Sequence, residues 1–128
     1  MINYKLIERS EPGVLGGGKK KFYAVIENDG EFNLSELTTA IEKICTVSGA
    51  DIRAVLYSLV DVAIDRLNRG TIVRLGDLGS MRVSLSSEGT EDTEKFNSKM
   101  IKNARVIFSP GKRIRTMLEQ VEYHKVQI

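Results

Sequence analysis

The order of apolar and polar positions divides the chain into short strands and amphipathic helices. Alternation in residues 2–8, and aromatic and branched side chains in residues 21–28, predict two strands. The connection between them, SEPGVLGGGKKK, contains Pro-Gly and three consecutive glycines, which indicates a flexible loop. We therefore expect an antiparallel β-hairpin with a long loop.

Two consecutive segments then carry apolar residues at helical spacing. The first lies within residues 30–49, and Ser35 is expected to cap it. The second begins after Ser48, with an aspartate three residues on, and ends before Gly70. Its apolar face is wider than the short preceding helix can cover, which suggests that a second chain covers the rest.

The remaining sequence alternates again and ends in a helix. Residues 71–87 predict two strands around a glycine-rich bend, and residues 100–108 predict a third strand. Residues 109–121 predict a helix capped by Ser109, with Pro110 at the first position, where a missing N–H costs nothing. The expected fold class is α+β, in the order hairpin, two helices, three strands and a helix.

The composition limits the class of protein. Of 128 residues 41% are hydrophobic but only 6% aromatic, so the core of a monomer would be small and oligomerisation is expected. The single cysteine excludes an intramolecular disulfide. We find no secretory signal and no apolar run near the ~20 residues that span a bilayer, so we expect a cytoplasmic protein with no membrane partner.

The charge is distributed unevenly along the chain. The net charge is +2, but residues 88–98 hold one basic and four acidic groups, a net of −3. Residues 99–128 hold seven basic and two acidic groups, a net of +5. The low total net charge therefore does not reveal that a basic C-terminal region follows an acidic insert. This matters because local charge, rather than total charge, governs encounter with a polyanion.

Four segments resemble the bacterial histone-like DNA-binding proteins, HU and integration host factor. They are SELTTAIEK, TVSGADIRAVL, IVRLGDLGSMRV and VIFSPGKRIR, in the family's order and spacing. The family's Gly-Phe-Gly-Thr-Phe bend is met in altered form by residues 77–81, and its Phe-x-Pro-Gly-Lys motif by residues 108–112. The resemblance does not cover residues 1–34, which suggests an HU-related subfamily with an N-terminal extension.

The resemblance implies an HU-like intertwined homodimer. Each chain would supply a two-helix base, a three-stranded antiparallel sheet with a β-ribbon arm, and a C-terminal helix. We expect an N-terminal β-hairpin extension at 1–33 and an HU-like DNA-binding domain at 34–128, with its arm at 86–99. The implied function is architectural binding of double-stranded DNA in the nucleoid, in the minor groove and with little sequence preference.

Eight basic residues are candidate DNA contacts, and solvated surface is the alternative for each. They are Arg74, Arg82, Lys99, Lys102, Arg105, Lys112, Arg113 and Arg115. The first two alternate with apolar residues, so they should lie on the wet side of the sheet. The last three stand at a helix N-terminus, where cations are unfavourable unless an anion binds. The other three follow the arm's return strand, where Lys102 has the opposite parity to Lys99 and Arg105.

The expected arm tip departs from the family. The family has basic residues and an Asn-Pro there, and the proline wedges between base pairs. This chain has prolines only at Pro12 and Pro110, and Phe96 is expected to pack across the ribbon rather than act as a wedge. The tip instead holds four carboxylates, Glu88, Glu91, Asp92 and Glu94. Phosphates repel carboxylates, so we expect weaker bending than by HU.

Other chemistry is poorly supported. No nucleophile and base are recognisable together, His124 has no partner cysteines, and GGGKKK lacks phosphate-loop spacing although it could touch DNA. We therefore expect no catalytic residues, metal, cofactor or small-molecule substrate. The alternative function is an HU-fold dimer that serves as a protein-interaction or structural module and has lost DNA binding.

Overall fold

The computed structural model describes residues 1–126 and separates into two compact units. The first unit comprises Met1–Phe32 and the residues from Met117 onward, and the second comprises Asn33–Thr116. The boundary between them falls inside the last helix. Residues 127 and 128, the end of the predicted second domain, lie outside the described residues.

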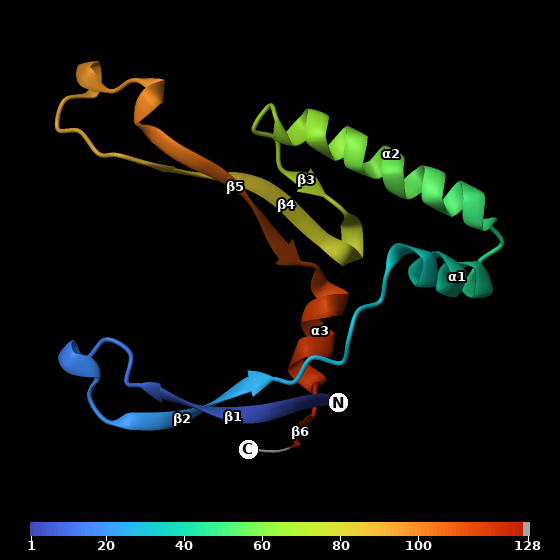
Figure 1. The fold of residues 1–128 in the computed structure, drawn as a ribbon. Helices are drawn as coiled ribbons and strands as arrows, with labels where there is room; N and C mark the ends of the chain where they lie inside the picture. Colours follow the sequence, from blue (N-terminus) through green and yellow to red (C-terminus); the bar gives the residue numbers. More distant parts are fainter. Residues whose placement is uncertain (127–128) are drawn as a thin grey trace. The chain divides into compact units, whose positions relative to one another are not determined.

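The described residues form an α+β fold, as the sequence predicts, and contain three α-helices and two three-stranded sheets (Figure 1). In chain order the elements are β1 (Ile2–Ser10), β2 (Lys20–Ile26), α1 (Leu34–Ile44), α2 (Gly49–Leu67), β3 (Val73–Arg74), β4 (Gly79–Ser87), β5 (Ile101–Pro110), α3 (Lys112–Gln120) and β6 (Tyr123–Lys125).

The first unit contains the predicted hairpin and a strand that was not predicted. β1 and β2 pair antiparallel, from Tyr4 opposite Ile26 to Ser10 opposite Lys20. β6 then pairs parallel with β1 on its other side, with Ile2 opposite Tyr123. A three-residue strand that pairs with the far end of the chain has no local pattern to reveal it.

Helix α1 is capped by Asn33, so the expectation that Ser35 caps it is wrong. The Oδ1 of Asn33 accepts from the backbone N–H of Glu36 at 2.9 Å, and the Asn33 N–H reaches the Glu36 Oε1 at 3.5 Å. This reciprocal capping box requires an acidic residue three positions after the cap, and Glu36 has that spacing only from Asn33. Ser35 lies in the first turn, and its carbonyl accepts from the Thr39 hydroxyl.

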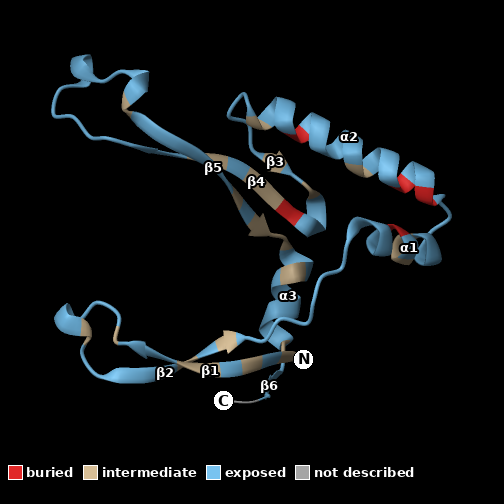
Figure 2. Cartoon of the chain, viewed as in Figure 1, coloured by how far each residue is buried: buried red, intermediate tan, exposed pale blue. Residues whose placement is uncertain are grey.

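Helix α2 begins as predicted, but a single chain leaves most of its apolar face uncovered. The Ser48 Oγ accepts from the Asp51 N–H at 3.3 Å. Ile52 and Ala63 are the only buried apolar side chains in the part of the chain that the structure describes. Val55, Val60 and Ile64 on the same helix remain between 53% and 63% exposed. In Figure 2 the few buried segments lie on α1, α2 and β4, all in the second unit.

The second sheet has the order β3-β4-β5. β5 extends to Pro110, which pairs with Gly79, so the chain is still extended where a helix was predicted. Ser109 is therefore not the helix cap and Pro110 is not the first helical residue. Helix α3 starts at Lys112, and the first helical bond runs from the Arg115 N–H to the Gly111 carbonyl at 2.9 Å.

Two glycines allow the bend before β4 to pack against the start of α3. The Gly111 N–H donates to the Leu78 carbonyl at 3.0 Å, and a Cβ on Gly111 would overlap the carbonyl of Asp77. Gly79 has a φ of 144°, and a Cβ there would overlap the Ser109 carbonyl. Since no side chain fits at either position, this junction depends on glycine.

Candidate nucleic-acid interface

The strand register brings three of the predicted arginines onto one side of the second sheet. Ser80 lies opposite Arg74 on β3, and Ser84 on β4 lies opposite Arg105 on β5. Directly opposed residues share a face, and residues two apart along a strand do so as well. Arg74, Arg82 and Arg105 therefore share one face, which we call the arginine face.

The other side of this sheet is apolar and lies toward α2. It carries Met81 opposite Phe108 and Val83 opposite Val106. Residues of α2 and of this side line a hollow of about 570 Å³ that no described residue fills; they include Ile64, Leu67, Val83, Leu85, Ala104 and Val106. The arginine face is thus the side of the sheet directed away from α2.

A second hollow, of about 380 Å³, continues the arginine face to the start of α3. It is lined by Arg74, Gly76, Gly79, Ser80, Ser109, Pro110, Gly111, Lys112 and Arg115. Ser80 and Ser109 lie opposite each other, in register with Arg74, on the arginine face. Helix α3 adds its first-turn N–H groups, which have no acceptor within the helix. Three cations and helix amide donors in one hollow suit a phosphate group.

All eight candidate residues are exposed, and none of them is neutralised by an acidic neighbour in the structure. Among residues 1–126 the ion pairs are Lys5–Glu27, Lys21–Glu11 and Arg69–Asp65, which involve none of the eight. Arg113 is also exposed in the first turn of α3 but does not line the hollow. Unpaired surface cations are the groups that release counterions from DNA.

Two of the predicted lysines lie in the arm, apart from the arginine face. A β-bulge between Ser86 and Ser87 leaves Lys102 as the extra residue of β5. Lys99 lies in a 3₁₀ turn, Ser98–Met100, rather than on the strand. Lys102 and Arg105 both lie on the return strand β5 as expected, but the expectation that Lys99 also lies on it is wrong. The alternation of faces along β5 does not continue through the bulge and the turn.

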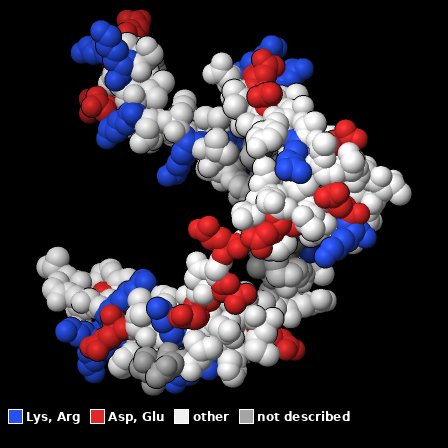
Figure 3. Space-filling view, turned by 45° about the vertical axis from the view of Figure 1, so that its right-hand side comes forward, with Lys and Arg blue, Asp and Glu red and all other residues white. Residues whose placement is uncertain are grey.

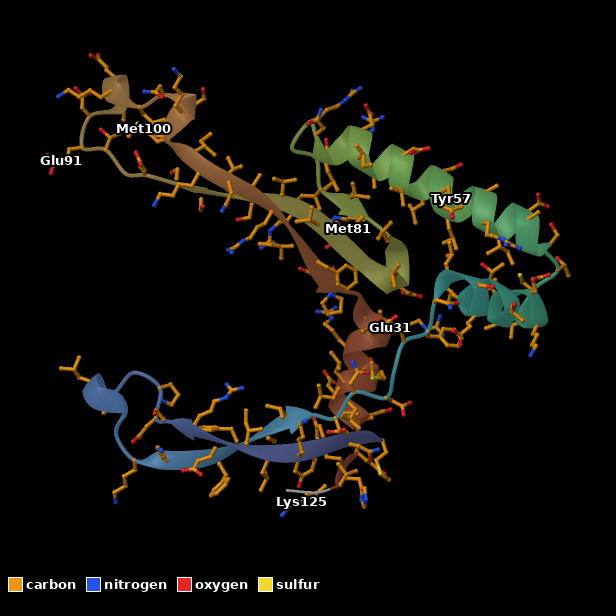
Figure 4. All side chains as sticks on the ribbon, in the orientation of Figure 1. Glu31, Tyr57, Met81, Glu91, Met100 and Lys125 are labelled. Carbon is orange, nitrogen blue, oxygen red and sulfur yellow. The ribbon has the colours of Figure 1, made fainter. Side chains whose placement is uncertain are left out.

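The tip of the arm is acidic and locally ordered. Glu91 lies at the outer bend of the arm, as Figure 4 shows. The Asp92 Oδ1 accepts from the Glu94 N–H at 3.0 Å, and the Asn97 Oδ1 accepts from the Lys99 N–H at 2.9 Å. Acidic and basic side chains lie next to each other at this end of the arm (Figure 3). The tip therefore carries charges of both signs, whereas the charged residues of the arginine face are all cationic.

Sequence reasoning placed the arginines correctly on the polar side but missed the serines and glycines around them. Ser80 and Ser109 line the hollow, and Gly79 and Gly111 shape it. The signal was present in the polar parity of the serines and in the glycine-rich bend. Within residues 1–126 no three side chains of the metal-binding types lie close enough to hold an ion. None of the described helices is both long and apolar enough to cross a membrane.

Comparison with known proteins supports the fold. A crystal structure from Bacteroides vulgatus ATCC 8482, provisionally described as a bacterial DNA-binding protein, matches with a TM-score of 0.66 and 13% identity. The match covers 98% of this chain and 48% of that one, so this chain spans about half its length. No curated protein sequence matches. Residues 1–125 match the model of the HU-HIG family, described as an HU domain fused to wHTH, Ig, or glycine-rich motif. Because this match covers nearly the whole sequence, the chain belongs to the HU-HIG family of HU-domain proteins.

Proposed function

We propose that the chain is a non-enzymatic architectural protein that binds double-stranded DNA as a homodimer in the nucleoid, largely without sequence preference. The observation that carries this proposal is the arginine face and its continuation into the hollow at the start of α3. It presents Arg74, Arg82 and Arg105 on one surface, and Lys112 and Arg115 at its end.

The chemistry of this surface fits the DNA backbone. Phosphates along a strand are neutralised by exposed, unpaired cations, and each contact releases counterions. Serine hydroxyls and helix N–H groups are common additional phosphate donors. Phosphate contacts position a protein on the duplex but carry no sequence information directly, which supports binding with little sequence preference.

The uncovered apolar surface supports the homodimer. The chain exposes 10840 Å². The usual scaling of surface with mass gives about 8,100 Å² for two compact bodies the size of the two units. The difference is about 2,700 Å² for one chain, or about 5,400 Å² for two chains. Obligate homodimers bury about 2,000–5,000 Å² or more in total, which is of the same order. The hollow between α2 and the apolar side of the second sheet is the surface that we assign to the second chain.

Bending by this protein should be weaker than bending by HU. A wedge fills the gap that opens when a base step is unstacked, and the arm of this chain contains no proline. Its tip carries Glu88, Glu91, Asp92 and Glu94, which phosphates repel. We expect the arginine face, rather than the arms, to supply most of the affinity.

Fluorescence anisotropy with duplexes of two unrelated sequences, at low and moderate salt, tests this function. We expect similar affinities for both duplexes, a steep loss with salt, and weaker binding by Lys112→Ala combined with Arg113→Ala. FRET between the duplex ends should report less bending than with HU, and light scattering should report a dimer. Bending equal to that by HU would contradict the expectation that the acidic, proline-free arm bends DNA less than the arm of HU does.

The second candidate function is a protein-interaction or structural dimer that no longer binds DNA. The acidic tip and an apolar hollow of about 660 Å³ on the first sheet, lined by Ile2, Tyr4 and Ile26 among others, favour it. Absence of DNA binding at low salt by a folded, dimeric protein would select this function over the first.

A further inference from the structure

The outer edge of strand β2 is unpaired in the described chain. β2 has β1 as its only strand neighbour there. The Glu27 N–H donates to the Asn3 carbonyl at 2.8 Å, and the ladder is continuous from there to Ser10 opposite Lys20. Because donors alternate in an antiparallel ladder, the odd residues of β2 bond to β1. The N–H and C=O groups of the even residues, including Phe22 and Ala24, therefore point outward.

The central part of this edge, residues 22–26, lacks the features that normally prevent strand pairing. Proteins protect edge strands with charges, prolines or bulges. Residues 22–26, Phe-Tyr-Ala-Val-Ile, contain no charge and no proline, and their register with β1 has no bulge. Phe22 and Ile26 are 62% and 67% exposed. The charges lie at the two ends instead, with Lys19, Lys20 and Lys21 before this segment and Glu27 after it.

We propose that the β2 edge pairs antiparallel with the β2 edge of a second copy of this chain, centred on Tyr23. The distribution of charge selects this partner and this direction. In a parallel pair the lysines of both copies would lie side by side and repel each other. In the antiparallel pair Lys19 lies opposite Glu27 of the second copy. Lys20 and Lys21 lie opposite Ile26 and Val25 of the second copy, so no lysine lies opposite another lysine.

The hydrogen-bonding parity agrees with this register. Centring on Tyr23 places Phe22 opposite Ala24 of the second copy, and both residues have outward N–H and C=O groups. Lys20 likewise lies opposite Ile26 of the second copy, and both of these residues have outward N–H and C=O groups. A large side chain beside a small one also packs without a clash. Tyr23 faces its own counterpart in a pair without hydrogen bonds, where Cα atoms are about 4.5 Å apart.

The β2 edge lies in the first unit, whereas the arginine face and the α2 hollow lie in the second. Pairing through β2 therefore uses residues other than those of the proposed DNA-binding dimer. A chain that uses both surfaces links one dimer to another.

Sedimentation velocity of the full chain over a wide concentration range tests the pairing. We expect the weight-average mass to rise with concentration beyond that of the dimer proposed for the second unit, and Ala24→Pro to abolish this further rise. Proline removes an outward N–H and leaves the bonds to β1 in place. The matched control is Ala24→Thr, which keeps the N–H and favours a strand. The proposal is overturned if the unmodified chain forms no species larger than the dimer proposed for the second unit, or if folded Ala24→Pro associates as strongly as Ala24→Thr.

Cysteine cross-linking tests the register and does not depend on the folding of the proline variant. In a Cys45→Ser background, Tyr23→Cys should form a disulfide-linked dimer on mild oxidation, because the expected Cα separation is within disulfide range. Phe22→Cys is the control, since it lies opposite Ala24 and not opposite itself. Equal cross-linking by the two variants, or none by Tyr23→Cys, contradicts the register.

Discussion

The arginine face makes a quantitative prediction about salt dependence. Arg74, Arg82 and Arg105 are exposed, unpaired and on one side of the sheet, so replacing all three with Gln should remove three phosphate contacts per chain. Each contact contributes about 0.9 to the slope of log K against log salt. We therefore expect the slope to become shallower by about 2.7 for each chain on the DNA.

The loss of affinity follows from the slope. Relative to a reference of about 1 M salt, a change of 2.7 in slope corresponds to roughly 500-fold weaker binding at about 0.1 M for each chain that contacts the DNA. This is about 4 kcal/mol of binding free energy. Anisotropy titrations at several salt concentrations give both quantities from the same data, and circular dichroism checks that the variant remains folded.

The matched control removes the same charge from another part of the chain. Lys43, Arg66 and Arg69 lie on or just after α1 and α2, and Arg69 is already paired with Asp65 at 3.4 Å. Their triple replacement by Gln lowers the net charge equally but should leave the slope nearly unchanged. If the two triple variants shift the slope by the same amount, the protein binds DNA through its overall charge and the arginine face has no special role.

Three further predictions test the fold and the arm. Asn33→Ala should lower the free energy of unfolding, measured in urea, by about 1 kcal/mol, as the loss of a helix cap does. Ser35→Ala should lower it much less, and the reverse order would contradict the observed cap. Gly111→Ala should lower the free energy of unfolding by about 1–3 kcal/mol and weaken DNA binding, because the new Cβ must displace the Asp77 carbonyl. An unchanged thermal unfolding curve would refute the close packing of Gly111 against Asp77. The acidic residues of the tip are Glu88, Glu91, Asp92 and Glu94. Converting all four to their amides should raise DNA affinity, and an unchanged affinity would mean that the tip lies far from the DNA.

The sequence was sufficient where local pattern and local chemistry agree. Alternation predicted the hairpin, and Ser48 followed by a helical apolar pattern predicted α2 and its cap. Polar parity placed Arg74 and Arg82 on the wet side of the sheet. The placement of Arg105 beside them needed the pairing of Ser84 with Arg105, because parity within one strand says nothing about its neighbour.

Prediction failed where two local signals competed or where the partner was distant. Asn33 and Ser35 are both good caps, and the choice depends on Glu36 lying three residues after Asn33. Ser109 and Pro110 form a typical helix start, but their pairing with β4 keeps them extended. β6 forms because Tyr123 meets Ile2 from the other end of the chain. Tertiary contacts of this kind outweigh local propensity.

The scarcity of buried side chains has a consequence for the amount of active protein. With Ile52 and Ala63 as the only buried apolar side chains among the described residues, much of the apolar burial of the proposed dimer must come from its second chain. Its stability then depends on concentration, and a tenfold dilution costs about 1.4 kcal/mol. Chains made at a low level would remain unpartnered and open to proteolysis. The supply of the proposed dimer would therefore rise more steeply than the rate of synthesis.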